Sequence, residues 1–226
     1  MIRTTPIDLQ RVLILGAGPG LGAAIARRFG REGYAVTLVA RREQALADLA
    51  DGVRHAGIGV DTVTADAADP RGFRRVLEEL AQHITPGVVV YNAALIARDS
   101  ILTSDTDYLV SSYAIDVLGA ITAAQVFTPA MRQAGTGTFL ATGGHPGVTP
   151  DTAYATLSLG KAGLRAAISL LHDELRGDGV RVVSVTITGA IAPGTPLDPD
   201  RIADAYWTLH TQSAADTGAE SFFDGR

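Results

Sequence analysis

A cluster of glycines near the N-terminus is the first group of residues whose spacing suggests chemistry. The segment LILGAGPGLGAAIARRF (13–29) joins a short apolar run to an amphipathic helical pattern, and its glycines are Gly16, Gly18, Gly20 and Gly22. Glycines at such a junction permit a tight turn and let the backbone approach a pyrophosphate, which the start of the following helix attracts. The segment therefore predicts a dinucleotide-binding turn. The alternative is a close strand–helix turn without a ligand.

The end of the next apolar run bears on which dinucleotide would bind. This run ends LVARRE, so Ala40 stands where an acidic residue would accept hydrogen bonds from the adenosine ribose of NAD, and Arg41 and Arg42 follow. A guanidinium donates paired, charge-assisted hydrogen bonds to a phosphate. We therefore predict NADP(H) as the preferred cofactor, with NAD(H) possible and Arg41 as the main contact. Alternatively, both arginines are solvated residues at a helix start.

The elements that must position these residues follow from the pattern of apolar segments. Candidate strands lie at 11–15, 35–40, 61–64, 87–91, 136–142, 180–187 and 219–223. Helical patterns lie between them, at 20–32, 43–56, 70–82, 105–134, 155–176 and 199–211. The strand runs are continuously apolar, as expected when crossover helices cover both faces of a sheet. The alternation predicts an α/β, single-domain Rossmann fold: a doubly wound parallel sheet of about seven strands with helices on both faces.

Composition limits the classes of partner. The length of 226 residues suits one α/β domain over 1–226. A net charge of -5 without a basic block argues against nucleic acid and anionic membranes. There is no cysteine, which excludes disulfides and zinc–thiolate sites, and we predict no metal site. The N-terminus lacks an apolar signal core and we recognise no stretch of membrane-spanning length, so we expect a soluble, cytoplasmic protein.

Several motifs along the chain resemble one protein family. The glycine spacing G-x-x-x-G-x-G (16–22) resembles the short-chain dehydrogenase/reductase family more than the G-x-G-x-x-G form. YNAA (91–94) resembles that family's Asn-Asn-Ala-Gly motif after the fourth strand. KAGLRAAISLLHDELRGDGVRVVSV (161–185) runs without gaps in register with the family's helix and sixth strand, and FFDG resembles its last strand. The resemblance covers essentially the whole chain.

The resemblance implies a set of cofactor-binding residues. Asp66 looks like the family aspartate that touches the adenine, Asn92 stands at the second asparagine of the fourth-strand motif, and Gly189 keeps the glycine of a Pro-Gly pair without its proline. The implied set is Gly16, Gly18, Pro19, Gly20, Leu21, Gly22, Arg41, Arg42, Asp66, Ala67, Asn92, Ala93, Ala94, Lys161 and Gly189.

The catalytic residues that the resemblance implies are mostly replaced. The family uses a tyrosine that exchanges a proton with the substrate oxygen, a lysine one turn later that holds the nicotinamide ribose and lowers the tyrosine pKa, a serine and an asparagine. The gapless match places the lysine at Lys161 and the tyrosine position at Leu157, which cannot transfer a proton. The serine falls within TGGHPG (142–147), at Thr142, Gly143 or Gly144, and the asparagine falls on Asp116. We therefore predict a degenerate catalytic set.

Other side chains are candidates for the missing proton donor. Tyr154 precedes Lys161 by seven residues, roughly 10 Å along a helix axis if helix runs through both. Anchoring the match on Tyr154 would put Ser158 at the lysine position, but it abandons the gapless match, so we favour the Lys161 register. The candidate catalytic residues are Lys161, Tyr154 and Thr142. His145 is an alternative because an imidazole titrates near neutral pH, and Asp116 is either a base or the ion-pair partner of Lys161.

These residues predict an NADP(H)-dependent oxidoreductase that transfers hydride between the cofactor and a small-molecule carbonyl or alcohol. The alternatives are an NADP(H)-binding sensor or scaffold without redox turnover, and a non-redox isomerase or dehydratase. A Gly/Pro-rich loop and a helix at about 188–212 form the predicted substrate segment, the helix being either a lid or a packed helix. Small residues in 105–134 and 155–176, at the helices by which relatives usually associate, predict a homodimer or homotetramer.

Overall fold

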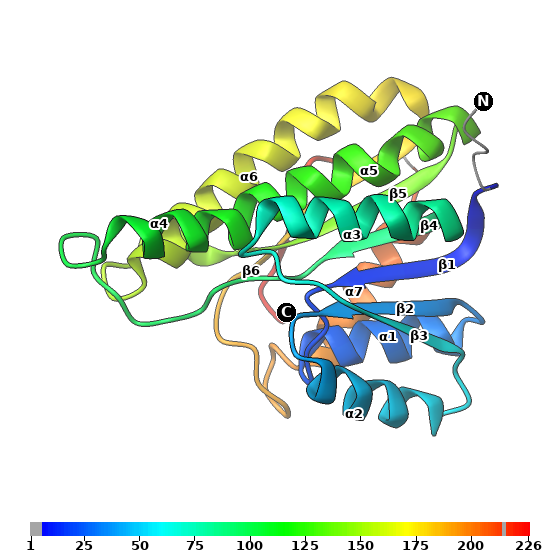
Figure 1. The fold of residues 1–226 in the computed structure, drawn as a ribbon, viewed down its shortest axis with the longest axis horizontal. Coiled ribbons are helices and arrows are strands. Elements are labelled where there is room, and N and C mark those ends of the chain that lie inside the picture. The colour runs from blue at the N-terminus through cyan, green and yellow to red at the C-terminus, as the bar shows by residue number, and fades with distance from the viewer. Residues whose placement is uncertain (1–5, 214–215) are drawn as a thin grey trace.

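The computed structural model describes residues 6–213 and 216–226, and its described strands form a single parallel sheet. The strand order is β3-β2-β1-β4-β5-β6-β7 (Figure 1). The strands are β1 (Asp8–Leu15), β2 (Ala35–Ala40), β3 (Val60–Thr64), β4 (Pro86–Tyr91), β5 (Gly137–Gly144), β6 (Val180–Ile187) and β7 (Glu220–Phe223). The expected doubly wound α/β architecture is confirmed.

Helices cover both faces of the sheet, and each face has its own buried cluster. On one face lie α1 (Leu21–Arg31), α2 (Glu43–Arg54) and α7 (Pro199–Thr211). On the other lie α3 (Pro70–His83), α5 (Gly119–Ala134) and α6 (Ala155–Leu175). Val88, Val89 and Val90 have no exposed surface although alternate residues point to opposite faces. This two-sided burial explains why the central strands read as continuous apolar runs.

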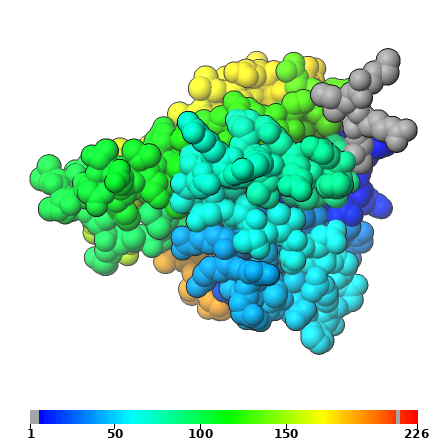
Figure 2. Space-filling model, viewed as in Figure 1, coloured from blue at the N-terminus to red at the C-terminus, as the bar shows by residue number. Residues whose placement is uncertain are grey.

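The crevice for a ligand lies where the strand order reverses. β1 pairs with β2 on one side and with β4 on the other, so the connections that leave β1 and β4 run to opposite faces of the sheet. A ligand crevice forms at such a switch point, beyond the carboxyl ends of the strands. At this end, α4 (Thr106–Tyr113) and the neighbouring loops form a lobe that projects from the body of the molecule (Figures 1 and 2).

The structure differs from the sequence prediction at two places near the site. The helix predicted over 105–134 contains a π-helical turn, Ala114–Leu118, between α4 and α5, and Asp116 lies in it. Such turns widen the helix locally and often occur at functional sites. The fifth strand continues through Gly143 and Gly144, which were expected to follow it in a loop. The pairing of these glycines with Thr186 and Ile187 of β6 explains the extension.

The helical run Thr106–Ala134 is long and apolar enough, by length and composition, to cross a membrane. The expectation that no stretch has this length was therefore wrong. In the fold, 56% of its most apolar window is buried, and the run packs against α3, α6 and the sheet. Its apolar residues thus contribute to the core of this face, where Phe127 and Met131 are fully buried.

Helix α7, which the sequence left as either a lid or a packed helix, packs along α1. Ile202, Ala203 and Tyr206 have no exposed surface, and the Asp198 carboxylate caps the helix by accepting from the N–H of Asp200. His210 bonds Thr138 at the start of β5 and Tyr34, so it lies at the end of the sheet away from the crevice. These contacts favour the packed helix.

Candidate nucleotide-binding and catalytic site

The glycine turn is pressed between β2 and the loop that follows β4. The N–H groups of Gly16 and Ala17 both donate to the Val39 carbonyl, each at 2.9 Å. Gly16 has a φ of 88°, and a Cβ there would clash with the backbone of Ala93. Only glycine tolerates both this dihedral and this approach without strain.

Beyond Gly16 the turn opens into free space at the start of α1. No atom lies within 4 Å of where a side chain on Gly18 or Gly20 would begin. No side chain caps the helix, and its first turn contains no acidic residue. Because the first N–H groups of a helix lack intrahelical partners, this end can bind an anion.

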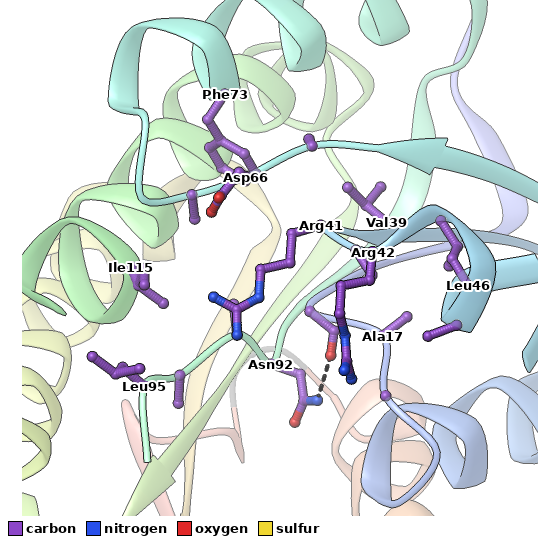
Figure 3. Close-up of a pocket in the computed structure, with 18 of the residues that line it drawn as sticks. Ala17, Val39, Arg41, Arg42, Leu46, Asp66, Phe73, Asn92, Leu95 and Ile115 are labelled. Carbon is purple, nitrogen blue, oxygen red and sulfur yellow. Dashed lines mark hydrogen bonds between the residues drawn. The ribbon is translucent and has the colours of Figure 1, made fainter. Parts of the chain in front are cut away.

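A cleft of about 230 Å³ runs from this turn across the ends of β2, β3 and β4 (Figure 3). Its main walls are residues 16–19, 39–42, 65–67 and 92–95. The predicted cofactor residues that line it are Gly16, Gly18, Pro19, Arg41, Arg42, Asp66, Ala67, Asn92, Ala93 and Ala94. Gly20, Leu21, Gly22, Lys161 and Gly189 do not line it. The structure thus brings most of the predicted set together.

Both arginines after β2 reach into this cleft. Both residues line the cleft, and Figure 3 shows their side chains extending into it from the segment that follows β2. Neither makes an ion pair with a described carboxylate, whereas Arg28 pairs with Asp204 at 2.7 Å and with Glu32. Two guanidinium groups without a carboxylate partner give this end of the cleft a positive charge.

Asn92 and Thr142 connect the glycine turn to β5 and α7. The Asn92 side chain donates to the Gly16 carbonyl at 2.9 Å, and its oxygen accepts from the Thr142 hydroxyl at 2.8 Å. Since that hydroxyl gives its proton to Asn92, it accepts from the Tyr206 hydroxyl, 2.7 Å away. The Thr142 hydroxyl is therefore engaged on the α7 side and does not contact Lys161.

Lys161 is held inside the fold by a backbone carbonyl. Its Nζ donates to the Thr142 carbonyl at 2.7 Å, and the residue is 6% exposed. Burial lowers the pKa of Lys161, and the charge of Asp116 acts in the opposite direction.

Asp116 is fully buried in the π-helical turn. One carboxylate oxygen accepts from the Leu95 N–H at 2.9 Å, while Oδ2 has no hydrogen-bond partner among the described residues. Burial raises the pKa of Asp116 to about 6, against the effects of Lys161 and of the Leu95 hydrogen bond. A carboxylate buried in this way does not contact a substrate directly, so the geometry gives no support to Asp116 as a base.

The positions predicted for the catalytic tyrosine and serine carry no hydroxyl. Leu157 lies one turn before Lys161 on α6 and is 8% exposed. A side chain on Gly144 would begin 3.7 Å from the Lys161 Cγ, an ordinary contact, whereas one on Gly143 would meet the Ser184 hydroxyl at 2.5 Å. Gly144 is therefore the residue that faces Lys161, and there is room for a side chain there.

Tyr154 lies at the N-cap position of α6, directly before the first helical residue. The Arg98 guanidinium lies 5.3 Å from the centre of its ring. Asp99 fixes this helix start by accepting from the N–H and hydroxyl of Thr156, and these hydrogen bonds lower its pKa against the effect of burial. The loop after β4 thus fixes the start of α6 beside Tyr154.

The remaining candidates are less well placed. The Ser158 hydroxyl donates to the Tyr154 carbonyl at 2.9 Å, so it does not replace a catalytic lysine. His145 is exposed, in the short turn His145–Gly147 after β5.

Comparison with known proteins agrees with this geometry. The family model for short chain dehydrogenase matches residues 10–201. The chain belongs to the short-chain dehydrogenase family. An uncharacterized oxidoreductase of Staphylococcus epidermidis is 25% identical over 213 residues, covering 88% of this chain and 90% of its own. Sulfoacetaldehyde reductase 2 of Chromohalobacter salexigens is 29% identical over 177 residues, covering 77% and 70%.

Solved structures with the same fold superpose closely. L-sorbose reductase of Gluconobacter frateurii, complexed with NADPH and L-sorbose, has a TM-score of 0.87 at 22% identity, covering 98% of this chain and 97% of its own. A metagenomic short-chain oxidoreductase in complex with NADP has a TM-score of 0.84 at 25% identity, covering 96% and 98%.

Sequence reasoning missed several residues that shape the site of this family member. Leu95, whose N–H binds Asp116, and Asp99, which fixes the start of α6, carry no motif of their own. Their position just after the YNAA motif was the only available signal. Tyr206 lies in the helix of the predicted substrate segment, and no local pattern indicated that it is the partner of Thr142.

Proposed function

We propose that the protein is an NADP(H)-dependent oxidoreductase that interconverts a small-molecule carbonyl and the corresponding alcohol. The observation that carries the cofactor assignment is the pair Arg41 and Arg42, which reach into the cleft without a carboxylate partner. A 2′-phosphate is the group that distinguishes NADP from NAD and that guanidinium groups bind well. The NADPH- and NADP-bound relatives support the same preference.

The other cleft residues fit the remaining parts of the dinucleotide. The uncapped start of α1 and the open space at Gly18 and Gly20 suit a pyrophosphate. Asp66 and Ala67 are placed to contact the adenine. Residues 92–94 are placed to contact a ribose between the adenine and the nicotinamide. When bound, the cofactor supplies or accepts the hydride.

On the catalytic side, Lys161 holds the nicotinamide ribose and Tyr154 handles the substrate proton. Thr142 acts as a positioning residue, because its carbonyl holds the Lys161 Nζ and its hydroxyl holds Asn92. The loop at 188–198, which bonds to itself between Ala192 and Leu197, is the proposed substrate-binding segment of a single domain.

A second candidate function is nucleotide binding without redox turnover. It is supported by Leu157 and Gly144, which leave no hydroxyl at the two positions beside Lys161. A sensor or scaffold needs the cofactor cleft but not a proton donor.

We also propose that the protein is cytoplasmic and forms a homodimer or homotetramer. Exposed apolar side chains on α4 and α6, such as Val110 at 62% and Leu170 at 65%, support self-association. Sedimentation velocity at micromolar concentration tests it, and a monomer there would contradict it.

The test of function is a titration with NADPH and NADH, followed by the loss of NADPH absorbance with a panel of aldehydes and ketones. We expect tight NADPH binding and oxidation by at least one carbonyl. Tight binding without turnover across the panel favours the second candidate. Failure to bind either nucleotide contradicts both.

The proton donor is tested by Tyr154→Phe. We expect turnover to fall at least about 100-fold because general acid catalysis is lost, while NADPH affinity stays unchanged. Tyr113→Phe, on the exposed side of α4, is the matched control. Equal turnover in the Tyr154 variant and the wild type would remove Tyr154 from the mechanism.

A further inference from the structure

Lys161 is the only lysine in the sequence. The other 18 of the 19 lysine and arginine residues are arginine. Arginine stays charged in any environment, whereas a buried lysine readily loses its proton. The one lysine or arginine that can become neutral in this way is therefore the buried Lys161.

Two groups near Lys161 can stabilise its positive charge, and only one of them is itself charged. Its Nζ donates to the Thr142 carbonyl, and Asp116 is the only acidic residue that is buried in the described part of the chain. Helix α6 and the π-helical turn pack closely next to Lys161. At the preceding residue, Gly160, any side chain would clash with the Asp116 carboxylate. The Asp116 carboxylate thus lies against the residue that precedes Lys161, and the two side chains do not form one of the direct ion pairs of the described residues.

We propose that Asp116 is a positioning residue that serves as the counter-ion of Lys161 and keeps it protonated in the folded protein. Through the charge of Lys161, Asp116 would also support nucleotide binding, and this consequence rests on the proposed function. The charge pairing of Asp116 and Lys161 does not depend on the proposed function.

The argument starts from the cost of burial. An ammonium taken out of water without a partner loses its proton instead of remaining charged. Burial lowers the pKa of Lys161 in this way, and the charge of Asp116 raises it. Likewise, the Asp116 Oδ2 has no hydrogen-bond donor, so a neighbouring positive charge is what compensates it. Each group needs the charge of the other.

The tyrosines around the pair do not supply a negative charge, and the Asp99 carboxylate is occupied at the start of α6 by hydrogen bonds from Thr156 and Tyr108. Tyr91 of β4 donates to the Ile115 carbonyl, and burial raises its pKa. Tyr108 of α4 bonds Asp99, and burial raises its pKa as well. Tyr206 of α7 is buried, also with a raised pKa, and His145 is exposed after β5. Phenols with raised pKa values stay neutral over the physiological range, which leaves Asp116 as the counter-ion.

Because there is one lysine, selective labelling reads its protonation directly. Lysine labelled with ¹³C at Cε gives a single side-chain signal, whose shift is followed from pH 5 to pH 11 in nucleotide-free protein. In Asp116→Asn, which is nearly isosteric, we expect the titration midpoint to fall by at least about one pH unit relative to wild type. Asp99→Asn, which alters a hydrogen-bonded carboxylate near the start of α6, is the matched control and should leave the midpoint unchanged.

Wild-type protein provides a second measurement that does not depend on the variant folding. As Asp116 takes up a proton near pH 6, the Lys161 signal should show a second, smaller inflection in the same range. No inflection in wild type, or equal midpoints in wild type and folded Asp116→Asn, would overturn the proposal.

The nucleotide step is measured separately by NADPH titration of the same proteins. Above its own lysine midpoint we expect Asp116→Asn to bind NADPH roughly tenfold more weakly than wild type, and below that midpoint, where Lys161 carries its proton, we expect the difference to shrink. If wild type does not bind NADPH but the lysine midpoint still moves, the proposed function fails and the counter-ion assignment stands. If NADPH binds and the midpoint does not move, only the counter-ion assignment fails.

Discussion

The two sides of the crevice keep their family patterns to different degrees. On the side of β1, β2 and α1, each element of the dinucleotide motif is present, and Gly16 has the positive φ and close backbone contact that explain its type. On the side of β5 and α6, the proposed assignment keeps Lys161 and puts Leu157, Gly144 and Asp116 where the residues that would work with it are expected. The nucleotide side depends on backbone geometry, which the fold itself requires. The proton-handling side depends on single side chains, which can change without altering the fold.

The largest expected effect comes from breaking the nucleotide side at Gly16. Gly16→Ala introduces a Cβ that clashes with Ala93 at a φ of 88°. We expect NADPH binding to be lost and the free energy of unfolding to fall by about 2 kcal/mol or more. NADPH titration and urea unfolding measure the two effects.

Gly18→Ala is the matched control, because no atom lies within 4 Å of the added Cβ and no positive φ is required. Stability should be retained. If Gly16→Ala binds NADPH as well as Gly18→Ala does, the nucleotide side is less constrained than its geometry indicates.

The next effect comes from repairing the catalytic side. Gly144→Ser combined with Leu157→Tyr restores both hydroxyls beside Lys161, and the structure has room for the serine. We expect NADPH-dependent carbonyl reduction to rise by at least about 100-fold, the contribution of a placed general acid. Steady-state rates with an aldehyde panel measure it.

The single variant Gly144→Ser is the control, since it adds no proton donor at the tyrosine position. A folded double variant with wild-type rates would show that residues other than these two limit the reaction. Thermal unfolding establishes whether the buried position of Leu157 accepts the larger ring.

A moderate effect is expected from Arg41→Ala, which tests how the nucleotide side recognises the cofactor. Loss of a charge-assisted hydrogen bond should weaken NADPH binding roughly tenfold or more and leave NADH binding nearly unchanged. Fluorescence titration with both nucleotides provides the ratio. Arg75→Ala, on the exposed surface of α3, is the control, and equal losses for NADPH and NADH would contradict the 2′-phosphate assignment.

The smallest effect lies away from both sides of the crevice, at His210. Burial, helped by the charge of Arg181, lowers the pKa of His210 to about 4. Since the unfolded histidine binds a proton at a higher pH, its contribution to stability is complete above about pH 6.5 and is lost as the pH falls toward 4. Because the ring is partly exposed, we expect a loss of only roughly 1 kcal/mol.

Urea unfolding between pH 4 and pH 7 measures this contribution. His210→Gln should flatten the pH dependence while NADPH affinity stays constant, and the exposed His83→Gln should change neither. An altered NADPH affinity in His210→Gln would show that the two ends of the sheet are coupled.

The sequence predicted the fold and most of the residues that the structure brings together along the cleft, because both depend on local patterns. Continuous apolar runs indicated buried parallel strands, and the glycine motif indicated the turn between β1 and α1. It could not decide between Gly143 and Gly144, because the choice depends on which of them faces Lys161 and which faces Ser184. It also could not show that the Thr142 hydroxyl is occupied by Asn92 and Tyr206.

The sequence by itself determined the order of strands and helices, the glycine turn and the position of Lys161 in a gapless motif. These features arise from residues close together in the chain, whose periodicity and backbone freedom can be read directly. Only the tertiary structure decided what surrounds Lys161: the Thr142 carbonyl from β5, and Asp116 from the π-helical turn. Thr142, which Lys161 contacts, and Asp116, whose charge acts on it, are distant from Lys161 in the sequence. Whether a buried charge is paired depends on what the packed helices and strands bring beside it, which no local pattern records.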